Sequence, residues 1–459
     1  MNRARRAAIA AVAAAGAALA LGYVLGRGGG APAAKTTRTI LETMTERSGA
    51  KGPLLKAYWI YIGPIGDMGW SYEHDQGRKY VEKILDGFVE TGYDEQVPED
   101  RVGQVIDSAV AKGYNLIFTT SFGYMDATNA KAGQYPRVLF GHCSGYKRMH
   151  PNIVTYFAEA YQAYYLNGII AGAMTKTGKV GYVAAQLIPE VKRHINAFAI
   201  GVREGARLAG RNPEEVKVLV RGPLGAWYAP DKARAEAEAL IAQGVDVIAF
   251  TEDSTAIVTT VAGYYAKGRR VYTFSHYSDM KRILRGDEKN AVLAGQIVDW
   301  GPLYLEIVMR ALIARQLSPG KPGETPVWSE FPPSTPRDYW WDMRMGVFDI
   351  APPREFRRAY EEKCRLIPDV YEHGELREYM GCLRRVEEEI IRSYVSKDIP
   401  EDVLNYVLKR RREILDGSWD PFTGPIRDNK GRLRIPPGMR ASHDMLWNMD
   451  WFVEGVVKV

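Results

Sequence analysis

Acidic and aromatic side chains recur where predicted strands of this 459-residue sequence end. In the stretch 57–80, an apolar segment runs into a polar, aromatic turn and then into a helix. Later strand ends carry the same kinds of residue. The candidates are Asp67, Trp70, Phe122, Tyr124, Trp227, Glu252, Asp253, Ser254, His276 and Asp279. Because ligands of open α/β sheets bind beyond the carboxyl ends of the strands, we expect these residues to border one cleft.

These residue types suit a flat heterocyclic ligand. Stacking of a nucleobase on an aromatic ring contributes about 1–3 kcal/mol. Carboxylates and hydroxyls accept hydrogen bonds from exocyclic amines, ring N–H groups or ribose hydroxyls, and charged acceptors form the stronger bonds. The pattern therefore predicts a binding cleft for a flat heterocyclic molecule.

Each candidate also has a purely structural interpretation. Trp70 and Trp227 would then pack beneath loops. Asp67 would complement the N-terminus of the following helix, and Asp253 with Ser254 has the composition of a helix cap. His276 would be a buried, hydrogen-bonded histidine. Only the coincidence across several strand ends favours a ligand site.

Motifs of catalysis and metal binding are missing from the sequence. It contains no GxSxG, HExxH, P-loop or CxxC pattern, and no two of its seven histidines are spaced i, i+3 or i, i+4. We therefore expect no enzyme activity, no metal and no cofactor. The net charge of +6 arises from 61 basic and 55 acidic residues that are scattered along the chain, so we expect no nucleic-acid partner.

From residue 57 onward, short β-branched and aromatic runs alternate with amphipathic stretches, which is typical of βαβ units. Predicted strands cover 57–63, 115–120, 138–141, 153–157, 180–184, 216–220, 245–250, 271–275 and 292–296. Predicted helices cover 71–85, 102–112, 125–132, 159–174, 190–209, 230–243, 255–266 and 301–315.

The length predicts more than one hydrophobic core, and the pattern restarts after the helix at 159–174. We expect an α/β protein of two Rossmann-like, doubly wound lobes joined by a hinge of several strands. Lobe 1 would span 55–158 and be completed by about 279–316, and lobe 2 would span 159–278 and be completed by about 317–352. Interlobe crossings would then fall near Glu159, Ser278 and Leu317.

The last hundred residues differ in character. Residues 353–412 form a charged helical extension, with helices predicted at about 353–364, 375–396 and 400–415. A solvated face is the simpler interpretation of this charge, and a partner-binding surface is the alternative. Residues 413–459 would pack back on the lobes. Cys364 and Cys382 could pair in an oxidising compartment or remain free thiols.

The N-terminus carries a targeting pattern. Arg3, Arg5 and Arg6 precede an apolar run over 7–26, which is about long enough to span a bilayer as a helix. We expect residues 1–27 to be a signal sequence or membrane anchor and 28–54 a flexible linker. The rest of the chain would then be extracytoplasmic, either anchored or secreted.

Several motifs resemble the basic membrane protein family of ABC-transporter solute-binding proteins. They are IGPIGDMGWSYEHDQGRKYVE, YYLNGIIAGAMTKTGKVGYVAA, NAFAIGVREGARLAGRNP, WYAPDKARAEAEALIAQGVDVIAFTEDS and AGQIVDWGPLYLE. The endings DPFTGPIRDNKGRLRIPPG and MDWFVEGVV are similar to its purine-binding branch. The likeness covers about 56–350 and 413–457.

This resemblance implies a type I periplasmic-binding-protein fold that closes on a purine nucleobase or nucleoside, such as adenine, and delivers it to an ABC permease. Trp70 would stack on the base, Trp227 would oppose it from the second lobe, and Asp279 would bind the ribose or the base edge. Asp67 is the acidic residue of the opening motif, while Phe122, Tyr124, Glu252, Asp253 and Ser254 would lie on cleft loops.

The chain departs from the family pattern in two ways. Its leader lacks the cysteine that anchors lipoprotein relatives, and residues 353–412 are unusually long and charged. Two other hypotheses stay open at this point. One is a nucleoside-cleaving enzyme that uses Asp67 and Asp279 as an acid/base pair, and the other is a membrane-anchored sensor whose charged helices bind a receptor.

Overall fold

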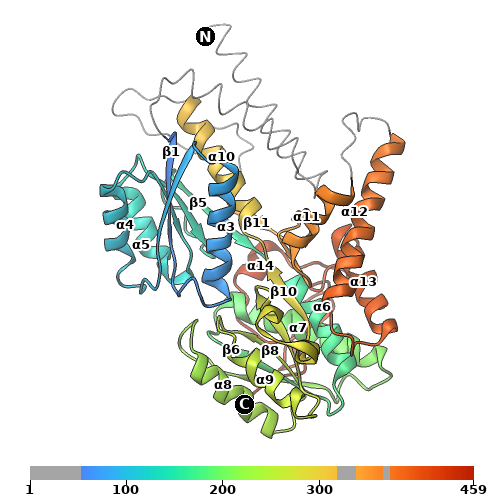
Figure 1. Cartoon of the computed structure of the whole chain (residues 1–459). Helices are drawn as coiled ribbons and strands as arrows, with labels where there is room; N and C mark the ends of the chain where they lie inside the picture. Colours follow the sequence, from blue (N-terminus) through green and yellow to red (C-terminus); the bar gives the residue numbers. More distant parts are fainter. Residues whose placement is uncertain (1–52, 318–337, 365–372) are drawn as a thin grey trace.

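The computed structural model describes residues 53–317, 338–364 and 373–459 (Figure 1). The predicted leader at 1–27 and nearly all of the predicted linker at 28–54 lie outside these residues. Within the described ranges, no helix combines the length and apolar character that crossing a membrane requires.

The first lobe is built on a six-stranded sheet with the order β11-β5-β4-β3-β1-β2, in which every strand pair is parallel. Its strands are β1 (Leu55–Ile60), β2 (Val89–Asp94), β3 (Leu116–Thr119), β4 (Leu139–Cys143), β5 (Ile153–Ala158) and β11 (Asp338–Trp341). Helices α4 (Val102–Ala111) and α5 (Met125–Gln134) cover one face, and α3 (Trp70–Ile84) and α10 (Gly301–Leu317) cover the other (Figure 1).

A seven-stranded sheet of order β12-β10-β9-β8-β6-β7-β15 forms the second lobe. Its strands are β6 (Lys179–Ala184), β7 (Lys217–Arg221), β8 (Val247–Thr251), β9 (Tyr272–Tyr277), β10 (Val292–Val298), β12 (Phe348–Asp349) and β15 (Val456–Lys458). Only the β10–β12 pair in this sheet is antiparallel. The helices are α6 (Tyr161–Met174), α7 (Pro189–Leu208), α8 (Pro230–Ala242) and α9 (Ala256–Ala266).

The chain passes between the lobes after β5, after β10 and between β11 and β12. Our expectation that residues 279–316 complete lobe 1 is therefore wrong for 292–298, because β10 pairs with β9 in the second sheet before α10 returns to the first. Likewise β11, which we assigned to lobe 2, extends the first sheet beside β5. At the first crossing, the buried Glu159 carboxylate lies 2.8 Å from the Arg193 guanidinium.

The β2 strand was not predicted from the sequence. It lies at the edge of the first sheet, and only Val89 of its six residues is buried. An edge strand of this kind lacks the apolar alternation on which strand prediction depends.

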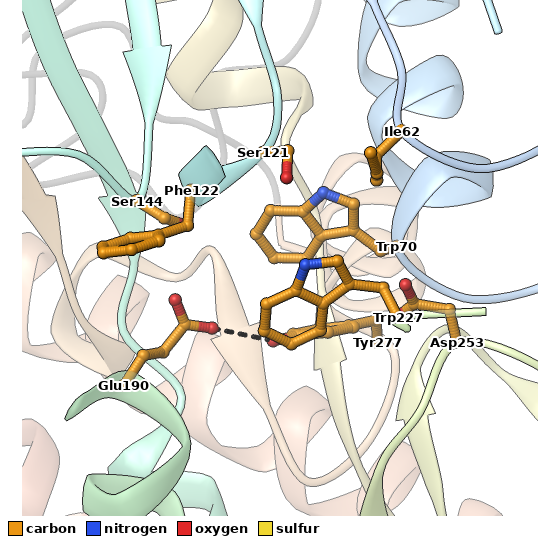
Figure 2. A pocket seen from close by; sticks show the side chains of 9 residues that line it. All are labelled: Ile62, Trp70, Ser121, Phe122, Ser144, Glu190, Trp227, Asp253 and Tyr277. Atoms are coloured by element: carbon orange, nitrogen blue, oxygen red, sulfur yellow. Dashed lines mark hydrogen bonds between the residues drawn. The ribbon is translucent and has the colours of Figure 1, made fainter. Parts of the chain in front are cut away.

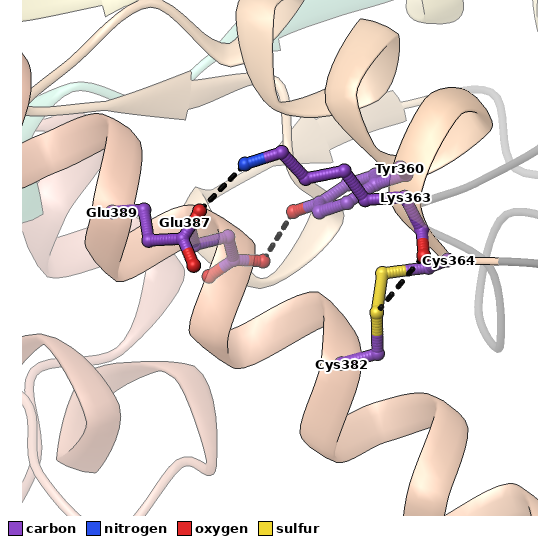
Figure 3. The surroundings of a disulfide bond; sticks show 6 residues. All are labelled: Tyr360, Lys363, Cys364, Cys382, Glu387 and Glu389. Atoms are coloured by element: carbon purple, nitrogen blue, oxygen red, sulfur yellow. Dashed lines mark hydrogen bonds and ion pairs between the residues drawn. A yellow bond between two sulfur atoms is a disulfide. The ribbon is translucent and has the colours of Figure 1, made fainter.

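The charged extension forms three helices, α11 (Pro353–Lys363), α12 (His373–Tyr394) and α13 (Glu401–Leu415). A disulfide joins Cys364 at the end of α11 to Cys382 of α12, and Tyr360 of α11 donates a hydrogen bond to Glu387 of α12 (Figure 3). The described parts of these helices are not uniformly solvated, because α13 packs on α6 of the second lobe.

Residues after α13 form a short hairpin of β13 (Ile426–Arg427) and β14 (Leu433–Ile435), the helix α14 (His443–Trp447), and β15. This segment lies against the second lobe, where β15 adds a parallel strand to β7 and the Arg193 guanidinium donates to the Leu446 carbonyl at 2.7 Å.

A buried ion triad fixes the extension to the second sheet. The guanidinium of Arg411 on α13 lies 2.5 Å from the Asp349 carboxylate on β12 and 2.7 Å from the Glu387 carboxylate on α12. Truncating one member of such a group leaves buried charge without compensation.

We expect Arg411→Ala to lower the free energy of unfolding by about 3–5 kcal/mol. Its neighbour Arg412, which pairs with Glu388 on the surface, gives the matched control, and Arg412→Ala should cost at most about 1 kcal/mol. Urea unfolding measures both variants, and equal losses would contradict a structural role for the triad.

Candidate functional site

A small cavity lies between the lobes and is lined by Ile62, Trp70, Ser121, Phe122, Ser144, Glu190, Trp227, Asp253 and Tyr277. The first five come from loops and helix starts after β1, β3 and β4, and the other four follow or end β6, β7, β8 and β9. Figure 2 shows these side chains gathered around one space. The cavity therefore lies at the carboxyl ends of the parallel strands of both sheets, as expected for open α/β folds.

The start of α3 is held by Asp67. Its carboxylate accepts hydrogen bonds from the backbone N–H groups of Gly69, Ser71 and Tyr72 at 2.7, 3.0 and 3.0 Å. These donors would otherwise lack partners, because the first N–H groups of a helix have none within it. The capping interpretation of Asp67 is thus the one that the structure supports.

Trp70 is the first residue of α3. Its indole N–H donates to the Thr120 carbonyl at 2.6 Å, and its ring meets that of Tyr277 edge-on with centroids 4.9 Å apart. The indole is therefore fixed from both lobes.

The two lobes touch directly beside the cavity. A Cβ built on Gly69 would lie only 2.2 Å from the Asp253 carbonyl oxygen, so only glycine permits this approach of one backbone to the other. Nearby, the Ser278 hydroxyl donates to the Met68 carbonyl. The structure is therefore a closed state of the two lobes.

Two carboxyl groups of the second lobe face the cavity. Burial raises the pKa of Glu190 to about 7, although the charge of Arg193 acts in the opposite direction. Burial, followed by the charges of Asp67 and Glu252, raises the pKa of Asp253 well above its ordinary value. Among the described residues that line the cavity, none is basic. A ligand that brings hydrogen-bond donors would satisfy these groups.

The cavity also holds hydroxyl groups. The Ser121 hydroxyl is buried and has no hydrogen-bond partner among the described residues, and the Tyr277 hydroxyl donates to Glu190 at 3.4 Å (Figure 2). Rings, acceptors and a free hydroxyl thus surround one small space. Such a lining can hold a flat polar ring.

The structure brings four predicted residues, Trp70, Phe122, Trp227 and Asp253, to the cavity. Two further candidates, Glu252 and Ser254, form hydrogen bonds within the protein instead. The Glu252 carboxylate accepts from the Ala229 N–H at 2.7 Å and from the Ser254 hydroxyl at 2.7 Å. Ser254 in turn accepts from the Ala256 N–H at the start of α9. Both residues lie outside the cavity lining, and their role in ligand binding stays a prediction.

Asp67, Tyr124, His276 and Asp279 also lie outside the cavity lining. The Tyr124 hydroxyl donates to the Val97 carbonyl, and the His276 ring bonds the Tyr164 hydroxyl at 3.0 Å. Asp279 accepts from the Lys281 N–H and pairs with Arg282. The hypothetical acid/base pair of Asp67 and Asp279 therefore does not face a common cavity.

Five lining residues, Ile62, Ser121, Ser144, Glu190 and Tyr277, were missed from the sequence. Tyr277, the last residue of β9, has a φ of +59°, and its ring centroid lies 3.9 Å from that of His276, so the alternation of side chains along a strand does not predict which of the two rings lines the cavity. Glu190 is the second residue of α7, the first helix after β6, and therefore obeys the strand-end rule that identified the other candidates.

Comparison with known proteins adds a family context. A family model described as ABC transporter substrate-binding protein PnrA-like (Bmp) matches residues 55–322. A purine-binding protein of Brucella abortus is 31% identical over 404 residues, which cover 88% of this chain and 93% of that protein. A putative ABC transporter glucose-binding protein of Haloferax volcanii is 38% identical over 59% of this chain and 64% of that protein.

Solved structures share the fold. An ABC-transporter solute-binding protein of Aeropyrum pernix superposes with a TM-score of 0.56 at 17% identity, covering 85% of this chain and 95% of that chain. A solute-binding protein of Conexibacter woesei gives a TM-score of 0.50 at 16% identity over 80% of this chain and 98% of that chain. The type I periplasmic-binding-protein fold is thereby confirmed for the described lobes.

We expect the Glu190→Gln variant to stabilise the ligand-free protein more at pH 8 than at pH 5. The raised pKa of about 7, against an ordinary value of 4.5, means that the folded state retains a proton that the unfolded state releases between these values. Stability is consequently lost as pH rises through this window. The difference between the two pH values should be about 1–3 kcal/mol in urea unfolding.

The exposed glutamate Glu238 on α8 is the control for this measurement. Glu238→Gln should leave the pH dependence of unfolding as it is. Equal effects of Glu190→Gln at pH 5 and pH 8 would show that the Glu190 carboxyl is hydrated in solution.

Proposed function

Because this chain belongs to the Bmp family of PnrA-like ABC-transporter substrate-binding proteins, we propose that it captures a purine nucleobase or nucleoside and delivers it to a membrane permease. Binding takes place outside the cytoplasm, as the family implies. The ligand lies in the interlobe cavity, where it stacks on indole rings and donates hydrogen bonds to carboxyl groups.

One observation supports this assignment above the others. Trp70 and Trp227 reach the same enclosed cavity as Glu190 and Asp253, two carboxyl groups without a basic partner in the described lining. A purine offers a flat face to the rings and N–H groups to the acceptors. The name of the Brucella relative agrees with this chemistry.

Closure of the lobes explains how the ligand would be retained. Type I binding proteins close by hinge motion, and the contact of Gly69 with Asp253 forms only when the two lobes meet.

Isothermal titration calorimetry with adenine, guanine, adenosine, guanosine and glucose tests the proposed function. We expect at least one purine to bind at micromolar concentration or below. Glucose is included because the Haloferax relative carries that name. Binding of glucose with no response to any purine would overturn the proposal.

The same titration with a Trp227 variant tests whether the purine stacks on the indole ring. Trp227→Ala should weaken purine binding by about 1–3 kcal/mol, the usual cost of a lost stacking partner. Tyr228 is adjacent and 43% exposed, and it is outside the cavity lining, so Tyr228→Ala should leave the affinity near that of the native protein.

We also expect Gly69→Ala to weaken purine binding at least about tenfold, which corresponds to about 1.4 kcal/mol. The added methyl group would overlap the Asp253 carbonyl and keep the lobes apart. Gly66 lies in the same loop, and a Cβ added there would have no atom within 4 Å, so Gly66→Ala is the matched control. Equal affinity of the two variants would contradict the closed complex.

A further inference from the structure

Helix α11 of the charged extension lies against α3 of the first lobe. The Arg354 guanidinium is 2.7 Å from the Glu73 carboxylate. One turn further along, the Arg357 guanidinium pairs with Asp299 and lies over the Tyr80 ring, 4.8 Å from its centroid. Glu73 and Tyr80 both belong to α3, whose first residue, Trp70, lines the ligand cavity.

The extension itself is fastened to the second lobe. Asp398, which follows α12, accepts hydrogen bonds from the Tyr265 and Tyr272 hydroxyls at 2.7 and 2.9 Å. The Tyr394 hydroxyl bonds the Ser275 hydroxyl at 2.9 Å. On α13, the Arg411 guanidinium binds Asp349 of the second sheet. These contacts make α12 and α13 part of the second lobe.

Helix α11 is tied to α12 by a covalent bond and two polar contacts (Figure 3). They are the Cys364–Cys382 disulfide, the Tyr360–Glu387 hydrogen bond and the Lys363–Glu389 ion pair at 2.6 Å. Since α12 is fixed to the second lobe, α11 must move with that lobe. The Arg354–Glu73 pair therefore spans the boundary between the lobes.

This pair lies close to the contact that closes the cavity. Glu73 is one helical turn after Gly69, which meets Asp253 of the second lobe. A separation of α3 from the second lobe at Gly69 also carries Glu73 away from Arg354. Asp299, by contrast, lies between β10 of the second sheet and α10 of the first lobe, at one of the crossings between the lobes.

We propose that α11 acts as a clasp, in which Arg354 binds Glu73 only in the closed state and thereby slows ligand release. The clasp rests on the proposed function, since it governs retention at the same cavity. Arg354 and Glu73 are positioning residues, because neither lines that cavity.

The burial and charge of Glu73 determine how strongly the loss of Arg354 should destabilise the closed state. Its side chain is only 5% exposed, and burial raises its pKa to about 7, whereas the charge of Arg354 acts in the opposite direction. Without Arg354, the closed state would hold a buried carboxylate near Asp299 with less compensation. The open state, in which water reaches Glu73, would gain population, and loss of one partner of a buried pair acts mainly on dissociation.

Stopped-flow release of the purine identified by calorimetry tests the clasp in the full chain. We expect Arg354→Ala to raise the dissociation rate about tenfold, and Arg354→Lys, which keeps the charge, to restore part of the loss. Arg358→Ala is the matched control, because Arg358 lies one turn away, is 74% exposed and pairs with Glu362 of the same helix. A release rate of Arg354→Ala equal to that of the control would overturn the proposal.

Hydrogen exchange of the ligand-free protein separates this proposal from the proposed function. Opening should speed exchange at 252–256, which follows β8 in the second lobe, whereas mere loosening of α3 should affect only 69–76. We expect faster exchange at both segments in Arg354→Ala and at neither in Arg358→Ala. If no purine binds, the proposed function fails while this measurement still decides the clasp, and unchanged exchange at 252–256 would reject it.

Discussion

The carboxylate of Asp67 fixes the part of the molecule on which the binding cavity depends. By accepting three backbone hydrogen bonds at the start of α3, it sets where the helix begins. That start places Gly69 against the backbone of Asp253 and the Trp70 ring against Tyr277. A residue outside the cavity thus positions both the closing contact and one of its aromatic walls.

The buried carboxyl groups are the second constraint on the cleft. Glu190 and Asp253 face a space without a basic lining residue among those described, and burial is the largest cause of the raised pKa of each. Closing such a cavity without a ligand is unfavourable in free energy, because buried polar groups without partners lose their hydration. A ligand with N–H donors would offset that cost, so ligand chemistry and lobe closure are coupled. The Arg354–Glu73 pair would add to the same closed state from outside the cavity.

Much of the fold was predictable because the spacing of apolar residues and the local composition indicate which segments are buried. The apolar strands at 57–63, 180–184 and 245–250 are largely buried in the structure, as parallel strands covered on both faces must be. The polar edge strand β2 was not predictable, because one exposed side leaves little apolar signal. The expected crossings near Ser278 and Leu317 were wrong because strand order within a sheet is a long-range property that local pattern does not encode.

The sequence predicted that the site lies at the ends of strands, but it predicted fewer of the individual residues that line the cavity. Trp70, Phe122, Trp227 and Asp253 reach the cavity, whereas His276 and Asp279 do not. Tyr277 rather than His276 lines the cavity, and Tyr277 has a positive φ, a backbone conformation that is uncommon for residues other than glycine and that the local sequence pattern does not predict.

The decisive measurement is a crystal structure of the protein with bound adenine. We predict density for the base between the rings of Trp70 and Trp227, with its N–H groups within hydrogen-bond distance of Glu190 or Asp253. Density for the base at another site, or a closed interlobe cavity that excludes it, would contradict the proposed binding mode.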